Sequence, residues 1–268
     1  MSNYHQDHDK LQDVQNRADK RGVLINKVGI SDIRYPIEVQ MEDGAWQNTI
    51  GDFKISVKLP AEKKGTHMSR MVEVLNTYRR YGMKEAQEIM EFVSTRLDAT
   101  EAHVEISFPF FVEKAAPETG KTSLMEYTGS YNLSYEDGKT DFKTGVIVNV
   151  TSLCPCSKEI SDYGAHNQRS EVQIMVHPSS NERIGLLTLV KIAEDSASAP
   201  LYPLLKREDE RHVTMLAFDN PVFVEDLSRN VALKLHDMST VLDKAFIKVI
   251  NFESIHKHNA FAEIALTF

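Results

Sequence analysis

The sequence contains little cysteine, and its two cysteines, Cys154 and Cys156, are separated only by Pro155. Two thiols this close together are not the framework of a disulfide-stapled secreted domain. No apolar run approaches the roughly 18 residues that a membrane-spanning helix needs. The first ten residues also lack the charged and apolar regions of a signal peptide. We therefore expect a cytoplasmic protein with no membrane partner.

Positive charge is also in deficit, because 31 Lys and Arg face 39 Asp and Glu, which gives a formal net charge of -8 over 268 residues. This balance argues against nonspecific binding to nucleic acid or to an anionic membrane. An anionic ligand would therefore need a local basic pocket. Aromatic residues make up only 8% and hydrophobic residues 41%, with 12 Gly and 9 Pro, which is typical of a globular protein.

The first half of the chain shows a regular order of hydrophobic patterns. Residues 1–30 are polar and predict a loosely held arm. Apolar residues then recur at period two, as expected for strands, or at helical spacing. The predicted order is strand, strand, helix, helix, strand, strand, over 33–41, 53–59, 69–81, 84–97, 102–113 and 123–135.

The second half repeats that order of six elements. They fall at 144–151, 169–177, 182–192, 221–236, 240–252 and 260–268. Antiparallel hairpins with a helix pair on one face form a layered α+β unit. The chain is therefore predicted to contain two such units in tandem, at 31–137 and 138–268, after the arm at 1–30.

The segment Cys154-Pro155-Cys156, followed ten residues later by His166, is the densest group of reactive side chains. In extended backbone, residues two apart project to the same face, so both thiols are predicted to address one site. Thiolate and imidazole are ligands for zinc and similar divalent ions. The alternative is that both cysteines are small buried hydrophobic residues and that His166 is a hydrogen-bonded loop histidine.

Two further charged clusters suit the same chemistry. A carboxylate of the segment 205–212, where Glu208 and Glu210 lie, offers a third metal ligand, although such a charge run is more often a solvated helix face. Glu253 and His256, three residues apart in a predicted turn, can act as an acid–base pair. The alternative for this turn is simple exposure to solvent.

Two predicted helix starts are candidate ligand sites. The segment 63–70 places Lys63, His67 and Arg70 before a helix, where free N–H groups and the helix dipole favour phosphate. It lacks the glycine spacing of a Walker loop, and an ordinary helix cap with basic neighbours is an equal alternative. Glu225 lies in the first turn of a later helix, where it either complements the helix dipole or binds a ligand's N–H groups.

Taken together, the Cys-Pro-Cys block, the run 164–170, the basic segment 63–70 and the segment 220–226 resemble the type IB GTP cyclohydrolase I family. The resemblance extends from about residue 60 to the C-terminus. It implies two tandem tunnelling-fold units per chain, assembled into a homotetrameric barrel. It also implies a zinc- or manganese-type enzyme that converts GTP and water into 7,8-dihydroneopterin triphosphate and formate, the entry step to folate and related pterins.

The resemblance also assigns roles to residues. It implies that Cys154, His166 and Glu210 hold the metal, with Glu208 as a substitute for Glu210, and that Cys156 is a second active-site thiol. It further implies that Glu225 anchors the guanine edge and that Glu253 and His256 are the acid–base pair. The triphosphate would require cations, for which the candidates are Lys63, Lys64, His67, Arg70, Lys206, Arg207 and Arg211.

Two other functions remain open at this level. A 7-cyano-7-deazaguanine reductase, which resembles the same family, would use one activated thiol and NADPH, with no metal. A non-catalytic purine- or pterin-binding protein would hold a structural zinc through Cys154, Cys156 and His166, normally in a closed site of four ligands. Metal content and the effect of a chelator on activity and folding discriminate among these three functions.

Overall fold

The computed structural model describes residues 13–179 and 183–268. The strands are β1 (Ile25–Gln40), β2 (Trp46–Leu59), β3 (Arg80–Tyr81), β4 (Glu101–Ala115), β5 (Thr122–Glu136), β6 (Lys139–Leu153), β7 (Asn167–Pro178), β8 (Ala199–Pro200), β9 (Leu242–Asn251) and β10 (Ala260–Thr267). The helices are α1 (Met68–Thr77), α2 (Met83–Leu97), α3 (Pro155–Ile160), α4 (Leu186–Glu194), α5 (Arg207–Asp219) and α6 (Val224–His236). No helix of the described residues is long and apolar enough to cross a membrane.

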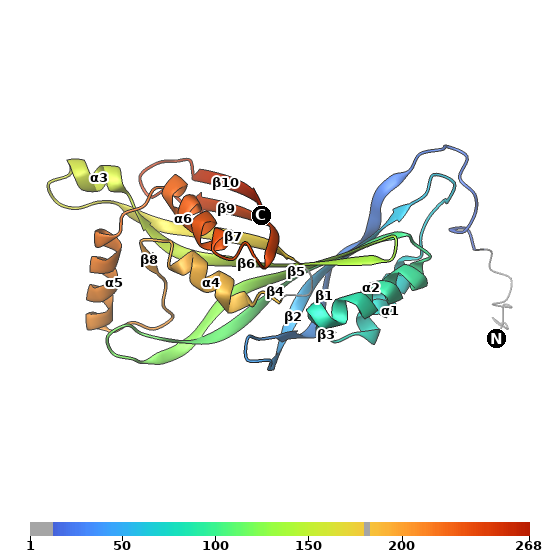
Figure 1. Cartoon of the computed structure of the whole chain (residues 1–268), viewed down its shortest axis with the longest axis horizontal. Coiled ribbons are helices and arrows are strands. Elements are labelled where there is room, and N and C mark those ends of the chain that lie inside the picture. Colours follow the sequence, from blue (N-terminus) through green and yellow to red (C-terminus); the bar gives the residue numbers. More distant parts are fainter. Residues whose placement is uncertain (1–12, 180–182) are drawn as a thin grey trace, which may run out of the picture.

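One large sheet organises the chain, in the order β10-β9-β7-β6-β5-β4-β2-β1-β3, with β8 paired to β6 (Figure 1). The long strands pair antiparallel, and among the strands of the described residues only the short β3 runs parallel to its neighbour, β1. The two halves of the sequence meet where β5 pairs with β6, so the sheet continues from one half into the other. The predicted α+β class with antiparallel hairpins is confirmed.

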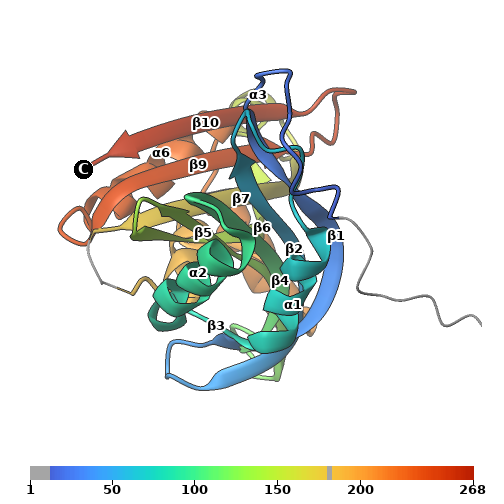
Figure 2. The same cartoon turned by 90° about the vertical axis from the view of Figure 1, so that its right-hand side faces the viewer.

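The period-two patterns become the buried face of this sheet. Val104, Ile106 and Phe108 of β4 alternate with more exposed residues, and Val172 and Ile174 of β7 do the same. These side chains form a single core with the buried sides of α1, α2, α4 and α6. The helices lie on one side of the sheet (Figure 2). The opposite face carries the alternate residues, among them Ser107, Asn132, Asn149 and Gln173, which are only partly buried or exposed.

Several boundaries differ from the sequence prediction. β1 begins at Ile25, inside the predicted arm 1–30. The sequence pattern missed this start because an irregularity between Ile30 and Ile33 interrupts the alternation of the strand. Residues 1–12 of that arm, and Glu182 at the predicted start of a helix, lie outside the described residues. Helix α1 ends at Thr77, not at residue 81, because Arg80 and Tyr81 pair with β1 as β3.

The second half also contains α3, which the sequence analysis did not predict, and α5, for whose start it gave a solvated helix face as an alternative. The segment 154–156 is not extended: Cys154 is the N-cap of α3, Pro155 is its first residue and Cys156 its second. Proline suits this first helical position because its missing N–H would have no partner there. The charged run 205–212 leads into α5, so its interpretation as a charged helix face is correct, with one exception at the buried Asp209.

Candidate active site

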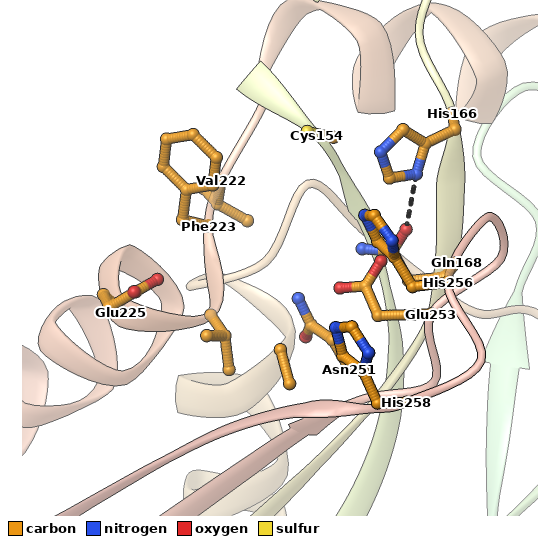
Figure 3. A pocket seen from close by; sticks show the side chains of 12 residues that line it. Cys154, His166, Gln168, Val222, Phe223, Glu225, Asn251, Glu253, His256 and His258 are labelled. Atoms are coloured by element: carbon orange, nitrogen blue, oxygen red, sulfur yellow. Dashed lines mark hydrogen bonds between the residues drawn. The ribbon is translucent and has the colours of Figure 1, made fainter. Parts of the chain in front are cut away.

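Four separate segments build a cavity of about 300 Å³ at the ends of β6 and β9 and the start of β7, which we call the thiol cavity (Figure 3). Cys154 follows β6, His166 precedes β7, residues 222–225 lead into α6, and the loop after β9 contributes further side chains. The thiol cavity is lined by Cys154, His166, Gln168, Val222, Phe223, Val224, Glu225, Asn251, Glu253, His256, His258 and Ala260. Five predicted site residues, which are far apart in the sequence, therefore share one cavity.

The backbones of Cys154 and His166 are held together by Ser157. The Ser157 hydroxyl donates to the Cys154 carbonyl at 3.1 Å and accepts from the His166 N–H at 3.2 Å. Cys154 N–H donates directly to the His166 carbonyl at 3.0 Å. The Ser157 N–H also points to the Cys154 sulfur, at 3.5 Å. The turn into α3 thus fixes the thiol and the imidazole beside each other.

Two carboxylates at the start of α6 have different surroundings. Asp226 accepts from the Phe223 N–H at 3.1 Å and forms an ion pair with Arg229, so it serves the helix. Glu225 is exposed, lines the thiol cavity and has no hydrogen bond or ion pair with any described residue. Asp226 therefore fits the alternative of a charge that stabilises the helix start, and Glu225 fits the alternative of a carboxylate available to a ligand.

The loop after β9 places Glu253, His256 and His258 at the thiol cavity. The rings of His256 and His258 stack, with centroids 5.2 Å apart and an interplanar angle of 14°. Both histidines are exposed, and Glu253 is half-buried. A carboxylate and an imidazole in one open cavity are chemically able to accept and return protons near neutral pH.

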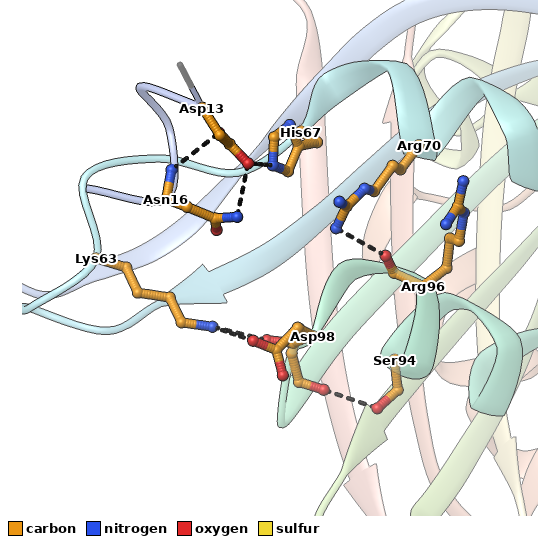
Figure 4. A network of polar contacts seen from close by, with 9 residues as sticks. Asp13, Asn16, Lys63, His67, Arg70, Ser94, Arg96 and Asp98 are labelled. Atoms are coloured by element: carbon orange, nitrogen blue, oxygen red, sulfur yellow. Dashed lines mark hydrogen bonds and ion pairs between the residues drawn. The ribbon is translucent and has the colours of Figure 1, made fainter. Parts of the chain in front are cut away.

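Three of the seven predicted cationic residues, Lys63, His67 and Arg70, line a second cavity, of about 110 Å³, which we call the basic cavity (Figure 4). Lys58 also lines the basic cavity, which lies where β2 leads into α1. The other four predicted cationic residues line neither cavity: Lys64, Lys206, Arg207 and Arg211. In Figure 1, α1 and α3 lie at opposite ends of the molecule, so a single chain does not bring the basic cavity to the thiol cavity.

Carboxylates of the same chain face two of these cationic groups. The Lys63 ammonium donates to Asp98 Oδ2 at 2.6 Å, and this contact lowers the pKa of the Asp98 carboxyl. His67 Nε2 lies 3.2 Å from Asp13 Oδ2. Arg70 donates only a long hydrogen bond, of 3.4 Å, to the Arg96 carbonyl.

A family model described as "Type I GTP cyclohydrolase folE2" matches residues 11–262 of this chain. The chain belongs to that family. It is 48% identical over 255 residues to "GTP cyclohydrolase FolE2" of Citrifermentans bemidjiense, covering 95% of this chain and 94% of that protein. The protein of the same name from Fervidobacterium nodosum is 45% identical over 253 residues, covering 94% and 96%.

Solved structures similar to this family member share the fold at low sequence identity. Uricase from Arthrobacter globiformis has a TM-score of 0.54 at 8% identity, covering 91% of this chain and 93% of that one. A urate oxidase variant from Bacillus sp. TB-90 has a TM-score of 0.55 at 9% identity, covering 91% and 98%. The likeness extends over most of each chain and supports a tunnelling-like fold.

Two of the metal ligands expected from the sequence, the sulfur of Cys154 and the imidazole of His166, line the thiol cavity, and both are donors of the type that zinc-like ions take. The third expected ligand, Glu210, does not line the cavity and is exposed in the first turn of α5, as is Glu208. Within the described residues, no three His, Cys, Asp or Glu side chains are grouped so as to hold an ion. Cys156 is exposed and also does not line the cavity.

Four lining or supporting residues have no role in the sequence prediction, namely Ser152, Gln168, Ser170 and Asn251. Each occupies a core-facing position of its strand and is buried. A sequence signal exists, because each stands where the alternation of its strand calls for an apolar residue, as Asn251 does after Ile247 and Val249. Polar residues at core positions are stable only when hydrogen-bonded, and they therefore mark a structured polar site.

Proposed function

We propose that this family member is a metal-dependent GTP cyclohydrolase of type IB, a hydrolase of cyclic amidine C–N bonds that converts GTP and water into 7,8-dihydroneopterin triphosphate and formate at the entry to folate synthesis. The observation that carries the proposal is the thiol cavity. It gathers a thiol, an imidazole, a free carboxylate and an acid–base pair from separate segments. Family membership over residues 11–262 supports the same substrate.

The residues divide the chemistry among them. Glu225 accepts the N1–H and N2–H of guanine, which adenine cannot offer in the same pattern. Cys154 and His166 hold a divalent ion of the zinc or manganese type. When bound, such an ion supplies Lewis acidity that lowers the pKa of a coordinated water towards neutrality for attack on guanine C8. Glu253 and His256 move the protons as formate leaves, the ribose rearranges and the new ring closes.

The ligand set is completed in the proposal by Glu210, with Glu208 as its substitute. Neither carboxylate has a hydrogen bond or ion pair with any described residue, so both side chains are available to a ligand at the first turn of α5. Cys156, which is exposed and does not line the thiol cavity, would serve as a second active-site thiol. Metal titrations of Glu210→Gln and Glu208→Gln distinguish the two carboxylates, because only the true ligand's variant loses affinity.

A second copy of the chain supplies the phosphate site. The thiol cavity has two carboxylates among its lining residues and no Lys or Arg, so it repels a triphosphate. Lys63, His67 and Arg70 lie at the opposite end of the chain, in the basic cavity. We place them against the triphosphate of a GTP bound in a neighbouring thiol cavity. The sheet face without helices suits a barrel of tandem tunnelling-fold units in a homotetramer.

The direct test is incubation of the purified protein with GTP and several divalent metals, following the pterin by fluorescence and measuring formate. Cys154→Ala and His166→Ala should abolish formate release while the protein stays folded. Full turnover in both variants would refute the metal assignment. Consumption of NADPH by metal-free protein, with no effect of a chelator, would instead indicate the reductase.

The composite site is tested by complementation between Cys154→Ala and Arg70→Ala. Each variant alone should be inactive or strongly impaired. Chains co-expressed with different tags and purified as mixed oligomers should regain activity, because one shared site in the mixture contains neither substitution. Activity no higher than that of either variant alone would contradict the composite site. It would not affect the chemistry assigned to the thiol cavity, which the Cys154→Ala and His166→Ala variants test separately.

A further inference from the structure

A chain of buried hydrogen bonds connects the two sides of the thiol cavity. Figure 3 shows its last link, between Gln168 and His166, and the position of Asn251 at its other end. Asn251 Oδ1 lies 2.7 Å from Ser170 Oγ, which lies 2.7 Å from Ser152 Oγ. Ser152 Oγ is 2.9 Å from Gln168 Nε2, and Gln168 Oε1 is 3.1 Å from His166 Nδ1. The four residues from Asn251 to Gln168 are at most 8% exposed, so water does not substitute for these partners.

Strand register builds this chain. Ser152 of β6 lies opposite Gln168 of β7, and Ser170 of β7 lies opposite Asn251 of β9. All four side chains face the core side of the sheet, where neighbouring strands present their side chains to one another. The row therefore runs across three strands and ends at an imidazole on one side and an amide on the other.

The direction of donation along the row is coupled. Each hydroxyl has one proton to donate, so a donor at one link commits the next link. Ser170 donates to Asn251 Oδ1 and Gln168 Nε2 donates to Ser152, so the proton between the two serines must come from Ser152. Turning over Gln168 alone would leave the two serine oxygens facing each other as acceptors, and turning over Asn251 alone would leave one hydroxyl proton without an acceptor. The row therefore reverses without losing a hydrogen bond only if both amides turn over together. In the direction found here, Gln168 Oε1 is the acceptor facing His166.

We propose that this row makes Gln168 a positioning residue, which holds His166 as the tautomer protonated at Nδ1 and leaves the lone pair of Nε2 for the thiol cavity. Histidine ligands generally have their tautomer set by the hydrogen bond of the other ring nitrogen. Ser254 Oγ lies 3.3 Å from the same Nδ1, and because a hydroxyl can accept as well as donate, this contact is compatible with the assignment. The use of Nε2 as a metal ligand rests on the proposed function, but the tautomer does not.

The same direction assigns a role to Asn251 at the other end. Its Oδ1 is occupied by Ser170, and its Nδ2 has no partner among the described residues although Asn251 lines the thiol cavity. Asn251 therefore presents an N–H donor to an acceptor atom of the bound base, such as a carbonyl oxygen. A ligand acceptor at Asn251 Nδ2 keeps Asn251 Oδ1 turned towards Ser170, which is the direction of the row that leaves the Nε2 lone pair of His166 free. Binding of the ligand and binding of the metal should therefore strengthen each other.

The test is nitrogen-15 NMR of the histidine side chains in metal-free protein at alkaline pH, with the His166 signals assigned from the His166→Gln spectrum. Wild-type His166 should carry its proton on Nδ1. Gln168→Met removes the acceptor and should release His166 into a mixture of tautomers, whereas Gln168→Glu keeps an acceptor and should preserve Nδ1–H. Asn251→Asp should preserve it too, because a carboxylate still accepts from Ser170, while it removes the donor to the cavity.

Zinc affinity is the second measurement. Gln168→Met should weaken zinc binding by about 10- to 100-fold, as loss of such supporting hydrogen bonds typically does, and Gln168→Glu should restore it. Ser196→Ala is the matched control, a buried serine whose hydroxyl donates to the Ile192 carbonyl away from the row, and it should change neither measurement. Wild-type protein protonated at Nε2 would overturn the inference without any variant. A correct tautomer without formate release from GTP would contradict only the proposed function.

Discussion

Replacing Glu225 by alanine tests whether the free carboxylate at the start of α6 recognises guanine. Glu225 lines the thiol cavity and is not engaged by any described residue, so its removal breaks no contact of the fold. Its neighbour Asp226 provides a matched control on the same helical turn, because Asp226 is engaged with the Phe223 N–H and with Arg229.

The expected magnitude follows from two charge-assisted hydrogen bonds to N1–H and N2–H. Each contributes about 1.5–3 kcal/mol when well shielded. Glu225 is exposed in the free protein, so we take the lower end, about 3 kcal/mol in total, and each 1.4 kcal/mol is tenfold. kcat/KM for GTP should fall about 100-fold in Glu225→Ala, mainly through KM. Asp226→Ala should instead lower stability by about 1 kcal/mol through the lost helix-start bond and leave KM nearly unchanged.

Steady-state kinetics with GTP and with ITP, followed through the pterin fluorescence and formate release, provide the assay. Hypoxanthine lacks the N2 amino group, so wild-type enzyme should prefer GTP and Glu225→Ala should lose most of that preference. An unchanged KM for GTP in Glu225→Ala would refute the guanine-anchoring role. An equal KM increase in Asp226→Ala would show that the effect comes from disturbing α6.

Three further outcomes are expected. Burial favours a higher pKa for the Asp209 carboxyl, but hydrogen bonds from Thr119, Lys206 and Glu118 lower it below its ordinary value. The unfolding free energies of wild-type protein and Asp209→Asn, measured against pH, should therefore differ most above about pH 4 and converge in acid. Parallel curves would contradict this prediction. Phe108→Ala should cost about 3–5 kcal/mol in denaturant unfolding, because its ring is 1% exposed in the core; a cost below 1 kcal/mol would show that the core relaxes. A chelator should stop formate release while circular dichroism stays native, whereas joint loss of both would favour a structural zinc.

The sequence predicted the strands well because the sheet has one covered face. In β4 and β7, alternation between buried and open positions is nearly unbroken, so periodicity alone locates them. The prediction was wrong at Cys154-Pro155-Cys156, where we expected extended backbone. Proline is compatible both with a strand end and with the first residue of a helix. The choice depends on Ser157, whose bonds to Cys154 and His166 close the turn in space.

The buried anchor of α5, Asp209, escaped prediction because it looks like surface charge in the sequence. Asp209 stands in a run of charged residues, yet it is fully buried and accepts from the tip of the β4–β5 hairpin. That partner lies about 90 residues away along the chain. No local pattern distinguishes Asp209 from Glu208 or Glu210, which are exposed.

The basic segment shows why the candidate site could be listed from the sequence but not assembled. A helix start with nearby cations attracts phosphate wherever it lies in the fold. The sequence therefore identifies Lys63, His67 and Arg70 as candidate phosphate binders, but it does not show how far they lie from Cys154. The structure gives the thiol cavity about 300 Å³, near the lower end for a ligand pocket, and the basic cavity only about 110 Å³. Neither cavity alone has both the volume and the charge for a nucleoside triphosphate. Because no Lys or Arg lines the thiol cavity, a triphosphate bound there needs cations from elsewhere, and a neighbouring copy of the chain is the source that the complementation experiment tests.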